Sequence, residues 1–194
     1  MNIDYFFISK PRCASTHIYE GLTNWDDKID GNKKYYHFTA KKMKSIFKDY
    51  DKKISFAVVR HPYDLVLSWY NEHRKDRYDD KTKNFYNITF DEWINKGCPT
   101  HWTNLDFNPL NQYLWLYENN KLIVSDIIKL ENYDHDINLI FNKIKKFLKN
   151  DITLTSLKNT RKNDSKNNIE LTPSQKNIIF ELFKKDFEYF NYTP

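Results

Sequence analysis

Glycine and cysteine are both scarce in this chain. Only 3 of its 194 residues are Gly, and Cys13 and Cys98 are its two cysteines. A phosphate-binding loop of the Gly-x-x-x-x-Gly-Lys-Ser/Thr type needs glycines where the backbone closes around phosphate, and the sequence has no such pattern. Two cysteines make no disulfide framework. These absences disfavour a P-loop kinase and a disulfide-stapled fold.

Long apolar runs are also missing. No stretch approaches the ~20 apolar residues that a membrane-spanning helix needs. No signal-peptide pattern precedes Asp4. From these two absences we expect a cytoplasmic protein without a membrane segment.

Charge and composition are those of a compact globular protein. Lys and Arg total 31 against 26 Asp and Glu, a net charge of +5, and the basic residues are spread along the chain. Such a mild and dispersed excess does not indicate a nucleic-acid partner, whereas a basic cleft for a small anion accounts for it. An apolar content of 40%, with 17% aromatic residues, is enough to bury a sizeable core. We expect a single domain over residues 1–194.

Arginine is rare against this lysine-rich background. Only five of the 31 basic residues are Arg: Arg12, Arg60, Arg74, Arg77 and Arg161. The free use of Lys, Asn, Ile and Tyr suggests an AT-rich genome, such as that of a virus or phage. Arg offers a planar fork that binds phosphate oxygens in pairs, which Lys cannot do. Positions that keep Arg are therefore informative about anion binding.

Two short segments read as strand-to-helix turns that carry a cation. In residues 5–17 a buried strand leads into a tight loop and the start of a helix. In residues 56–70 a second buried strand ends at Arg60, and a helix follows with Pro62 in its first turn. Cationic residues at such turns hold phosphate-like anions. Two turns of this kind predict a ligand with two separate anionic ends.

The rest of the chain alternates strands and helices. We expect strands at 4–9, 54–59 and 122–130, and helices at 16–22, 40–47, 62–77, 89–96, 110–117 and 133–148, with a last helix from 173. Thr39 can cap its helix, and capping boxes start the helices at Thr89 and Thr172. Residues 97–109 and 149–171 read as irregular connections. The pattern predicts an α/β fold: an open parallel sheet flanked by helices, with both turns at its carboxyl edge.

The two turns resemble those of the sulfotransferases that use 3′-phosphoadenosine 5′-phosphosulfate (PAPS). In that family the first loop reads Pro-Lys/Arg-x-Gly/Ala-x-Thr and grips the 5′-phosphosulfate, and residues 11–16 match it. The second motif reads Arg-x-Pro-Tyr-Asp with a Ser eight residues after the Arg, and it grips the 3′-phosphate; residues 60–68 match it. The resemblance implies a sulfotransferase fold related to the P-loop nucleotide kinases, PAPS as cofactor, 3′,5′-ADP (PAP) as product, and no metal.

The resemblance also assigns cofactor-binding residues. They are Arg12, Cys13, Ala14, Ser15, Thr16, His17, Arg60 and Ser68. Ser15 and His17 depart from the usual residues of the family's loop. Residues 159–162 resemble the family's Asn-x-Ser/Thr-x-Arg loop, so Arg161 or Lys162 can reach a cofactor phosphate, unless this is simply a solvated basic loop. Residues 185–190 resemble the closing Asp-Phe-Glu-x-Phe motif, for which we expect a packing role.

Catalysis needs a cation and a base. Negative charge builds on the departing phosphate oxygen, and Arg12 is the candidate to stabilise it. A neutral His suits the removal of the acceptor's proton. His37 is the first candidate, because the uronyl 2-O carbohydrate sulfotransferases carry their catalytic His at a similar place. A His bonded within the core is the alternative for this residue.

A second histidine lies in a segment that resembles the His-Trp…Pro-Gln region of Golgi carbohydrate sulfotransferases. His101 is therefore the alternative base. Together with Trp102 and Gln112 it is also a candidate substrate contact, against a plain packing role. The resemblance thus implies sulfuryl transfer from PAPS to an acceptor hydroxyl, with a carbohydrate favoured.

Other functions stay open at this point. The acceptor can instead be a tyrosyl protein or a small alcohol. A P-loop nucleotide kinase would need the missing glycines and a Mg²⁺-binding carboxylate. A nucleotide-binding module without catalysis would lack a base beside the phosphosulfate.

Overall fold

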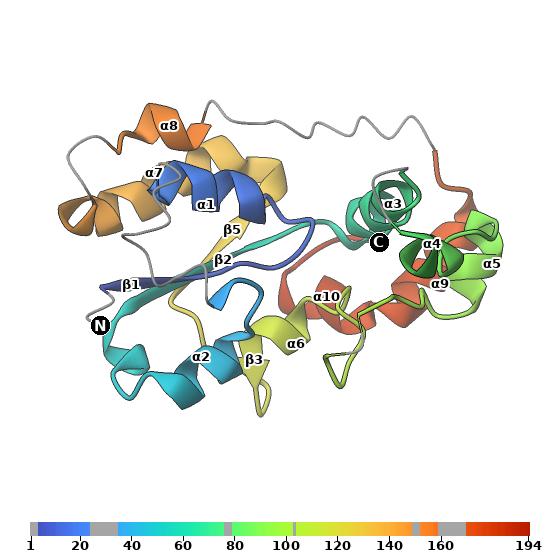
Figure 1. Cartoon of the computed structure of the whole chain (residues 1–194), viewed down its shortest axis with the longest axis horizontal. Helices are drawn as coiled ribbons and strands as arrows, with labels where there is room; N and C mark the ends of the chain where they lie inside the picture. The colour runs from blue at the N-terminus through green and yellow to red at the C-terminus, as the bar shows by residue number, and fades with distance from the viewer. Residues whose placement is uncertain (1–3, 24–34, 76–78, 103, 149–151, 159–169) are drawn as a thin grey trace. The chain divides into compact units, whose positions relative to one another are not determined.

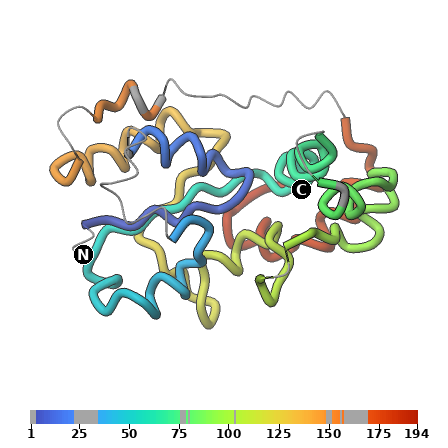
Figure 2. The backbone as a smooth tube through the Cα atoms, viewed as in Figure 1, coloured from blue at the N-terminus to red at the C-terminus, as the bar shows by residue number. Residues whose placement is uncertain are grey.

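The computed structural model describes residues 4–23, 35–75, 79–102, 104–148, 152–158 and 170–194. The chain forms two compact units (Figure 1; Figure 2). The first comprises residues 1–60 and 114–164, and the second comprises residues 61–113 and 165–194.

A parallel sheet forms the centre of the first unit. Its strands β1 (Tyr5–Ile8), β2 (Ile54–Val59) and β5 (Asp126–Lys129) lie in the order β1-β2-β5. Tyr5 pairs with Ile54, and Phe56 pairs with Asp126. The central strand β2 is buried from Ser55 to Val59, as a continuously apolar strand between two parallel neighbours should be. The predicted α/β fold with an open parallel sheet is confirmed.

Helices cover both faces of this sheet. Helices α1 (Ser15–Thr23), α7 (Tyr133–Ile144) and α8 (Leu154–Lys158) lie together on one face, and α2 (Ala40–Ile46) lies on the other (Figure 1). Phe6 of β1 packs against Phe47 and Tyr50 on the α2 side, with ring centroids 5.1 and 4.9 Å away. Two short 3-10 turns, Leu130–Asn132 and Lys145–Phe147, flank α7.

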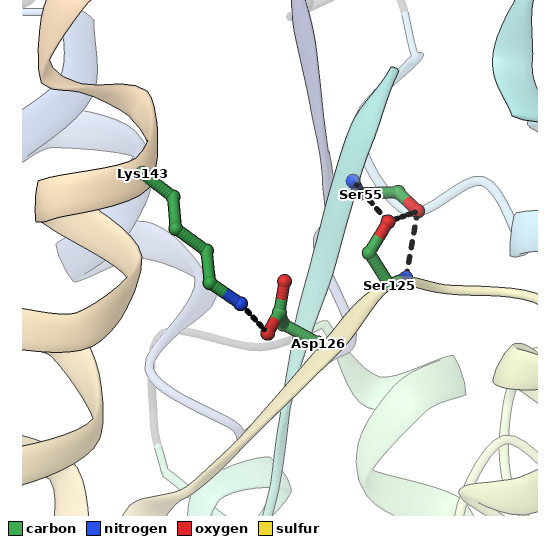
Figure 3. A network of polar contacts seen from close by, with 4 residues as sticks. All are labelled: Ser55, Ser125, Asp126 and Lys143. Carbon is green, nitrogen blue, oxygen red and sulfur yellow. Dashed lines mark hydrogen bonds and ion pairs between the residues drawn. The ribbon is translucent and has the colours of Figure 1, made fainter. Parts of the chain in front are cut away.

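Side chains fix where β5 begins (Figure 3). The Ser55 N–H donates to Ser125 Oγ at 3.2 Å, and the Ser125 N–H lies 3.0 Å from Ser55 Oγ and 2.9 Å from the Ser55 carbonyl. Next to this pair, Lys143 of α7 forms an ion pair with Asp126. The serines join β2 to β5, and the ion pair holds α7 against the strand.

The second unit is helical. It contains α3 (Pro62–His73), α4 (Asp80–Asn84), α5 (Phe90–Asn95), α9 (Pro173–Leu182) and α10 (Lys184–Tyr189). Helix α9 packs against both α3 and α5. The capping boxes predicted at Thr89 and Thr172 are both present. Fully buried aromatic side chains, among them Trp69, Trp93 and Tyr86, fill its core.

Several predicted element boundaries are wrong. The expected strand over 122–130 is two pieces, because β4 (Lys121–Leu122) pairs with β3 (Tyr117–Glu118) in an antiparallel hairpin and only residues 126–129 join the parallel sheet. Asn119 and Asn120 make that hairpin turn in the left-handed region, with φ of 50° and 59°.

Three helices also differ from expectation. The helix expected over 110–117 shrinks to α6 (Tyr113–Leu116), because Asn108 Oδ1 accepts the Leu110 N–H at 3.0 Å in a local turn. The last helix breaks at Phe183 into α9 and α10. Helix α8 lies in a segment expected to be irregular, where Leu157 is fully buried. Over the described residues, no helix has the length and apolar character needed to cross a membrane.

Candidate functional site

The loop between β1 and α1 has a backbone suited to anions. Arg12 and Ala14 both lie in the left-handed region, with φ of 62° and 53°, although neither is glycine. Left-handed residues within a turn direct successive N–H groups toward one side, and such concave backbones bind anions. Helix α1 follows at Ser15, and the N–H groups of a first helical turn lie outside the helix's own hydrogen-bond ladder. Residues 12–16 therefore form a candidate phosphate site.

The sheet brings a second cation to the same edge. Because β1 and β2 are parallel neighbours, their carboxyl ends lie at one edge, where the loop follows Ile8 and Arg60 follows Val59. Burial raises the pKa of the Cys13 thiol, while the charges of Lys10 and Arg60 act in the opposite direction. Arg60 is thus close enough to the loop to act on it electrostatically.

Lys10 and Cys13 occupy the inner side of the loop. Lys10 is only 1% exposed, and its Nζ lies 3.6 Å from Cys13 Sγ and 3.5 Å from the Pro11 carbonyl oxygen. The Cys13 side chain is equally buried. A contact from Cys13 to a cofactor would therefore come from its backbone N–H.

His17 is oriented into the first unit's core. Its Nε2 lies 2.5 Å from the Leu157 carbonyl oxygen, and the Tyr133 hydroxyl donates to the same oxygen at 3.1 Å. The two rings meet edge to face, 5.6 Å apart. The side chain of His17 thus ties α1 to α7 and α8, and its predicted role in cofactor binding stays a prediction.

The segment from Tyr35 to Phe38 packs against the loop. The Tyr36 hydroxyl lies 3.2 Å from Ser15 Oγ and 3.2 Å from Thr16 Oγ1. The His37 backbone N–H donates to Ser9 Oγ at 2.8 Å, and His37 Nδ1 lies 2.5 Å from the Ser9 carbonyl oxygen. A carbonyl only accepts, so Nδ1 carries the proton and the lone pair is on Nε2. His37 therefore lies beside the loop as the tautomer that a base requires.

The environment of His37 also keeps the ring neutral. Burial lowers its pKa from 6.5 to about 4, the charge of Lys10 lowers it too, and the hydrogen bond to Ser9 opposes them. An imidazole with this pKa is unprotonated at pH 7 and can accept a proton. His37 itself has a φ of 62°, a left-handed conformation that is unusual for a residue with a side chain.

Ser68 and His61 belong to the second unit. Ser68 lies in α3 and is fully buried. His61 caps that helix, because its Nδ1 accepts the Tyr63 N–H at 3.3 Å and its Nε2 lies 3.1 Å from the Thr193 carbonyl oxygen. These contacts give His61 a structural role. The predicted role of Ser68 in 3′-phosphate binding stays a prediction.

His101 and Trp102 lie in an aromatic cluster of the second unit. The Trp69 indole donates to the Tyr86 hydroxyl at 2.7 Å, and that hydroxyl lies 3.3 Å from His101 Nδ1. The ring centroids of Trp69 and Trp102 are 5.9 Å apart. Burial lowers the pKa of His101, and the nearby Asp79 opposes the shift. His101 and Trp102 are partly exposed, so both can still contact a substrate.

Gln112 is fully buried, which fits the packing alternative. Its backbone N–H donates to the buried Asp186 carboxylate at 2.8 Å, and the Tyr113 N–H donates to the other carboxylate oxygen at 2.9 Å. Its predicted contact with the acceptor stays a prediction. Arg161 and Lys162 lie outside the described residues.

The structure adds four residues that sequence reasoning did not place. Ser9 orients His37, Tyr36 contacts Ser15 and Thr16, Lys10 charges the inner side of the loop, and Asp186 binds two backbone amides of the second unit. For Tyr36 the available signal was its place beside His37 in an aromatic run. For Asp186 it was the closing motif, which indicated packing without identifying the amides.

A parallel sheet whose carboxyl edge carries two arginines and a loop with a backbone suited to anions is typical of α/β proteins that bind phosphate groups. Comparison with known families identifies the protein further: residues 10–193 match the Sulfotransferase family, and the chain belongs to this family. Membership implies an enzyme that transfers a sulfuryl group from PAPS. No curated protein and no solved structure gives a significant match.

Proposed function

We propose that this enzyme transfers the sulfuryl group of PAPS to a hydroxyl group of a carbohydrate, with His37 as the general base. The observation that carries the proposal is the contact of His37 with Ser9, the residue that opens the candidate phosphate loop. It sets the ring's tautomer and its position together. A nucleotide-binding module without catalysis would need neither.

The residues at the sheet edge fit PAPS, which supplies the sulfuryl group when bound. The left-handed backbone at Arg12 and Ala14 and the start of α1 suit the phosphosulfate, and Arg60 suits the 3′-phosphate. The guanidinium of Arg12 would stabilise negative charge on the departing phosphate oxygen, an interaction stronger in the transition state than in the ground state. Ser15 and Thr16 would add hydroxyl donors, held in place by Tyr36.

His37 would take the proton of the acceptor hydroxyl on Nε2. Its Nδ1–H stays on the Ser9 carbonyl, so the ring cannot turn without losing that hydrogen bond. A pKa of about 4 keeps the base unprotonated across the physiological range.

The carbohydrate acceptor rests on the resemblance of the motifs to the uronyl 2-O branch of carbohydrate sulfotransferases. A tyrosyl protein or a small alcohol is the second candidate. Sulfation of a glycan array by the full chain with PAPS, run beside a tyrosine-containing acidic peptide, separates them. Transfer to glycans supports the proposal, and transfer to the peptide alone contradicts it.

Cofactor selectivity tests the assignment of the sheet edge. Calorimetry should show tight binding of 3′,5′-ADP and much weaker binding of 5′-AMP, because only the first carries the phosphate assigned to Arg60 and Ser68. Equal affinities would remove that assignment while leaving the acceptor question open.

A further inference from the structure

A surface groove in the second unit lies among residues to which the proposed mechanism gives no role. It has a volume of about 680 Å³, within the range of small-molecule sites. One wall is the end of α3, with Tyr70, Asn71 and Arg74. The other is the connection into α5, with Asn87 and Phe90. All of its lining belongs to this unit.

The two walls of the groove are fastened to each other. The Tyr70 hydroxyl donates to the Ile88 carbonyl, and the rings of Tyr70 and Phe90 meet edge to face with centroids 5.2 Å apart. Tyr70 also packs against the buried Trp93, 5.3 Å away. The aromatic rings at the bottom of the groove are therefore held in place by these contacts. A ligand would not need to order them first.

Arg74 gives the groove a positive charge in a fixed position. Its guanidinium carbon lies 4.8 Å from the centre of the Tyr70 ring. A guanidinium stacked on a ring retains its outward N–H groups for a bidentate contact with a carboxylate or sulfate. In a chain with five arginines among 31 basic residues, the choice of Arg over Lys here favours such a planar contact.

The other polar groups suit neutral hydroxyls. The amides of Asn71 and Asn87 each offer donors and an acceptor. Glu92 lines the groove too, and its Oε2 accepts the Thr89 N–H and hydroxyl, both at 2.9 Å. These hydrogen bonds lower the pKa of Glu92, so the carboxylate stays ionised and can accept from a hydroxyl. A purely anionic ligand would be repelled by Glu92, whereas a polyhydroxylated ligand with one acidic group suits both charges.

We propose that this groove binds a segment of an acidic carbohydrate, with a carboxylate or sulfate on Arg74 and sugar hydroxyls on Asn71, Asn87 and Glu92. The half-buried Phe90, which lines the groove, would take the apolar C–H side of a sugar ring. The assignment rests on the carbohydrate acceptor proposed above and deepens it, because it names an acidic glycan as the substrate class. It concerns binding, so it can be tested without turnover.

Calorimetry on the full chain without nucleotide tests the groove. The probes are tetrasaccharides of hyaluronan, unsulfated chondroitin and heparosan, which carry uronates, and chitotetraose, which is neutral. At least one uronate probe should bind roughly tenfold or more tightly than chitotetraose, the usual weight of a hydrogen bond to a charged group. Arg74→Gln should abolish this preference, and Arg74→Lys should restore only part of it because the fork is lost.

Matched variants separate the groove from general charge effects. Lys96→Gln removes one exposed positive charge from α5's C-terminal cap, outside the groove, and should leave the preference unchanged. Asn87→Ala should weaken the uronate and neutral probes alike. Every variant should keep the 3′,5′-ADP affinity of the original chain, since none replaces a residue assigned to the nucleotide, and should keep its thermal unfolding midpoint, since Arg74, Asn87 and Lys96 are exposed.

Two results would overturn the proposal: equal binding of uronate and neutral probes, or a uronate preference that Arg74→Gln leaves intact. Failure of the proposed function looks different. A chain that binds uronate probes through Arg74 but transfers no sulfuryl group from PAPS would keep the groove and lose the carbohydrate sulfotransferase assignment. A chain that sulfates neutral glycans without any uronate preference would keep the carbohydrate sulfotransferase assignment and lose the groove.

Discussion

At the scale of single residues, His37 shows how position and protonation state come from the same contacts. The Ser9 carbonyl fixes Nδ1 as the donor, and burial beside Lys10 disfavours the charged ring. Both effects leave a lone pair on Nε2 at neutral pH. The same burial makes the imidazole a weaker base than one with an ordinary pKa near 6.5. The negative charges of a bound cofactor would raise the pKa of the ring again.

Replacing His37 with Ala tests its role as the base. Transfer should slow by roughly 10²–10⁴-fold, the usual weight of a general base. The affinity for 3′,5′-ADP should stay nearly unchanged, because the ring is assigned no contact with the nucleotide. Rapid-quench or steady-state transfer assays with calorimetry on the same protein measure both quantities. The control is His135→Ala, since the side chain of His135 is 77% exposed on α7.

His101→Ala decides between the two candidate bases. If it abolishes transfer while His37→Ala retains full activity, the base is His101, and its aromatic cluster with Trp102 is the acceptor side of the site. The opposite pattern would leave His101 as a packing or substrate-contact residue.

The protonation of His37 should be visible directly. Its pKa near 4 means that the folded protein leaves this ring neutral between pH 6.5 and about 4, whereas the unfolded chain protonates it near 6.5. The unfolded state then binds more protons in this window, so His37 lowers the free energy of unfolding as the pH falls. An NMR titration of the His37 ring should give a midpoint near 4. A midpoint near 6.5 would show that burial does not hold the ring neutral.

At the scale of elements, the sequence predicts best what neighbouring residues decide. The strand over 54–59 and the caps at Thr39, Thr89 and Thr172 are confirmed, since apolar runs and capping patterns are local signals. The limits of β5 depend on Ser55, 70 residues away from Ser125 in sequence. Besides the local turn at Asn108, the first residue of α6 contacts a distant side chain, because the Tyr113 N–H donates to Asp186, 73 residues away. Such distant contacts leave no local pattern.

In the candidate site, too, the sequence predicts the residues that lie in short local motifs and misses the contacts between distant residues. The loop of residues 11–16 and Arg60 follow from short motifs at strand ends, and the structure places both at one edge of the sheet. The contact between Ser9 and His37 joins residues 28 apart. Sequence reasoning chose His37 by resemblance but had no means of predicting its tautomer, its pKa or the role of Tyr36. Those depend on which backbone group and which cation lie next to the ring.

Arg12 and Arg60 should have separable functions, one in turnover and the other in nucleotide binding. Arg12→Ala should chiefly lower the turnover rate, because its charge matters most on the departing oxygen. Arg60→Ala should chiefly weaken binding of 3′,5′-ADP, because the 3′-phosphate is remote from the reacting sulfur. Calorimetry and steady-state kinetics on both variants measure the split. Equal losses of turnover and nucleotide affinity in both would show that the two cations act on one phosphate.

A helix cap gives a prediction on stability. Thr172 Oγ1 accepts the Gln175 N–H at 3.3 Å, and Gln175 Oε1 accepts the Thr172 N–H at 2.9 Å. Thr172→Ala should lower the free energy of unfolding by about 1 kcal/mol, measured by urea denaturation. Thr172→Ser keeps the hydroxyl and should restore most of the loss. An unchanged stability in Thr172→Ala would mean that α9 starts independently of its cap.

Over the molecule, the arginine and lysine side chains that the structure describes differ in where they lie. Arg12 and Arg60 lie at the carboxyl edge of the sheet, and Arg74 lies in the groove of the second unit. Lysines in contrast form surface ion pairs such as Lys44 with Asp51, at 2.8 Å. Exposed pairs of this kind contribute little to stability. Lys10, which is buried in the loop between β1 and α1, is an exception among the lysines.

Sulfuryl transfer by this enzyme should not depend on a metal ion. Phosphoryl transfer from ATP uses Mg²⁺ to bridge the β- and γ-phosphates, and PAPS has no such pair to bridge. Among the residues that the structure describes, no three His, Cys, Asp or Glu side chains gather where they could hold a metal ion. The charge on the departing oxygen is instead assigned to Arg12 and the loop amides. Sulfuryl transfer should therefore persist after dialysis against EDTA, with the rate measured before and after Mg²⁺ is added back. A strict requirement for Mg²⁺ would contradict the assignment of Arg12 and favour phosphoryl-transfer chemistry at this sheet edge.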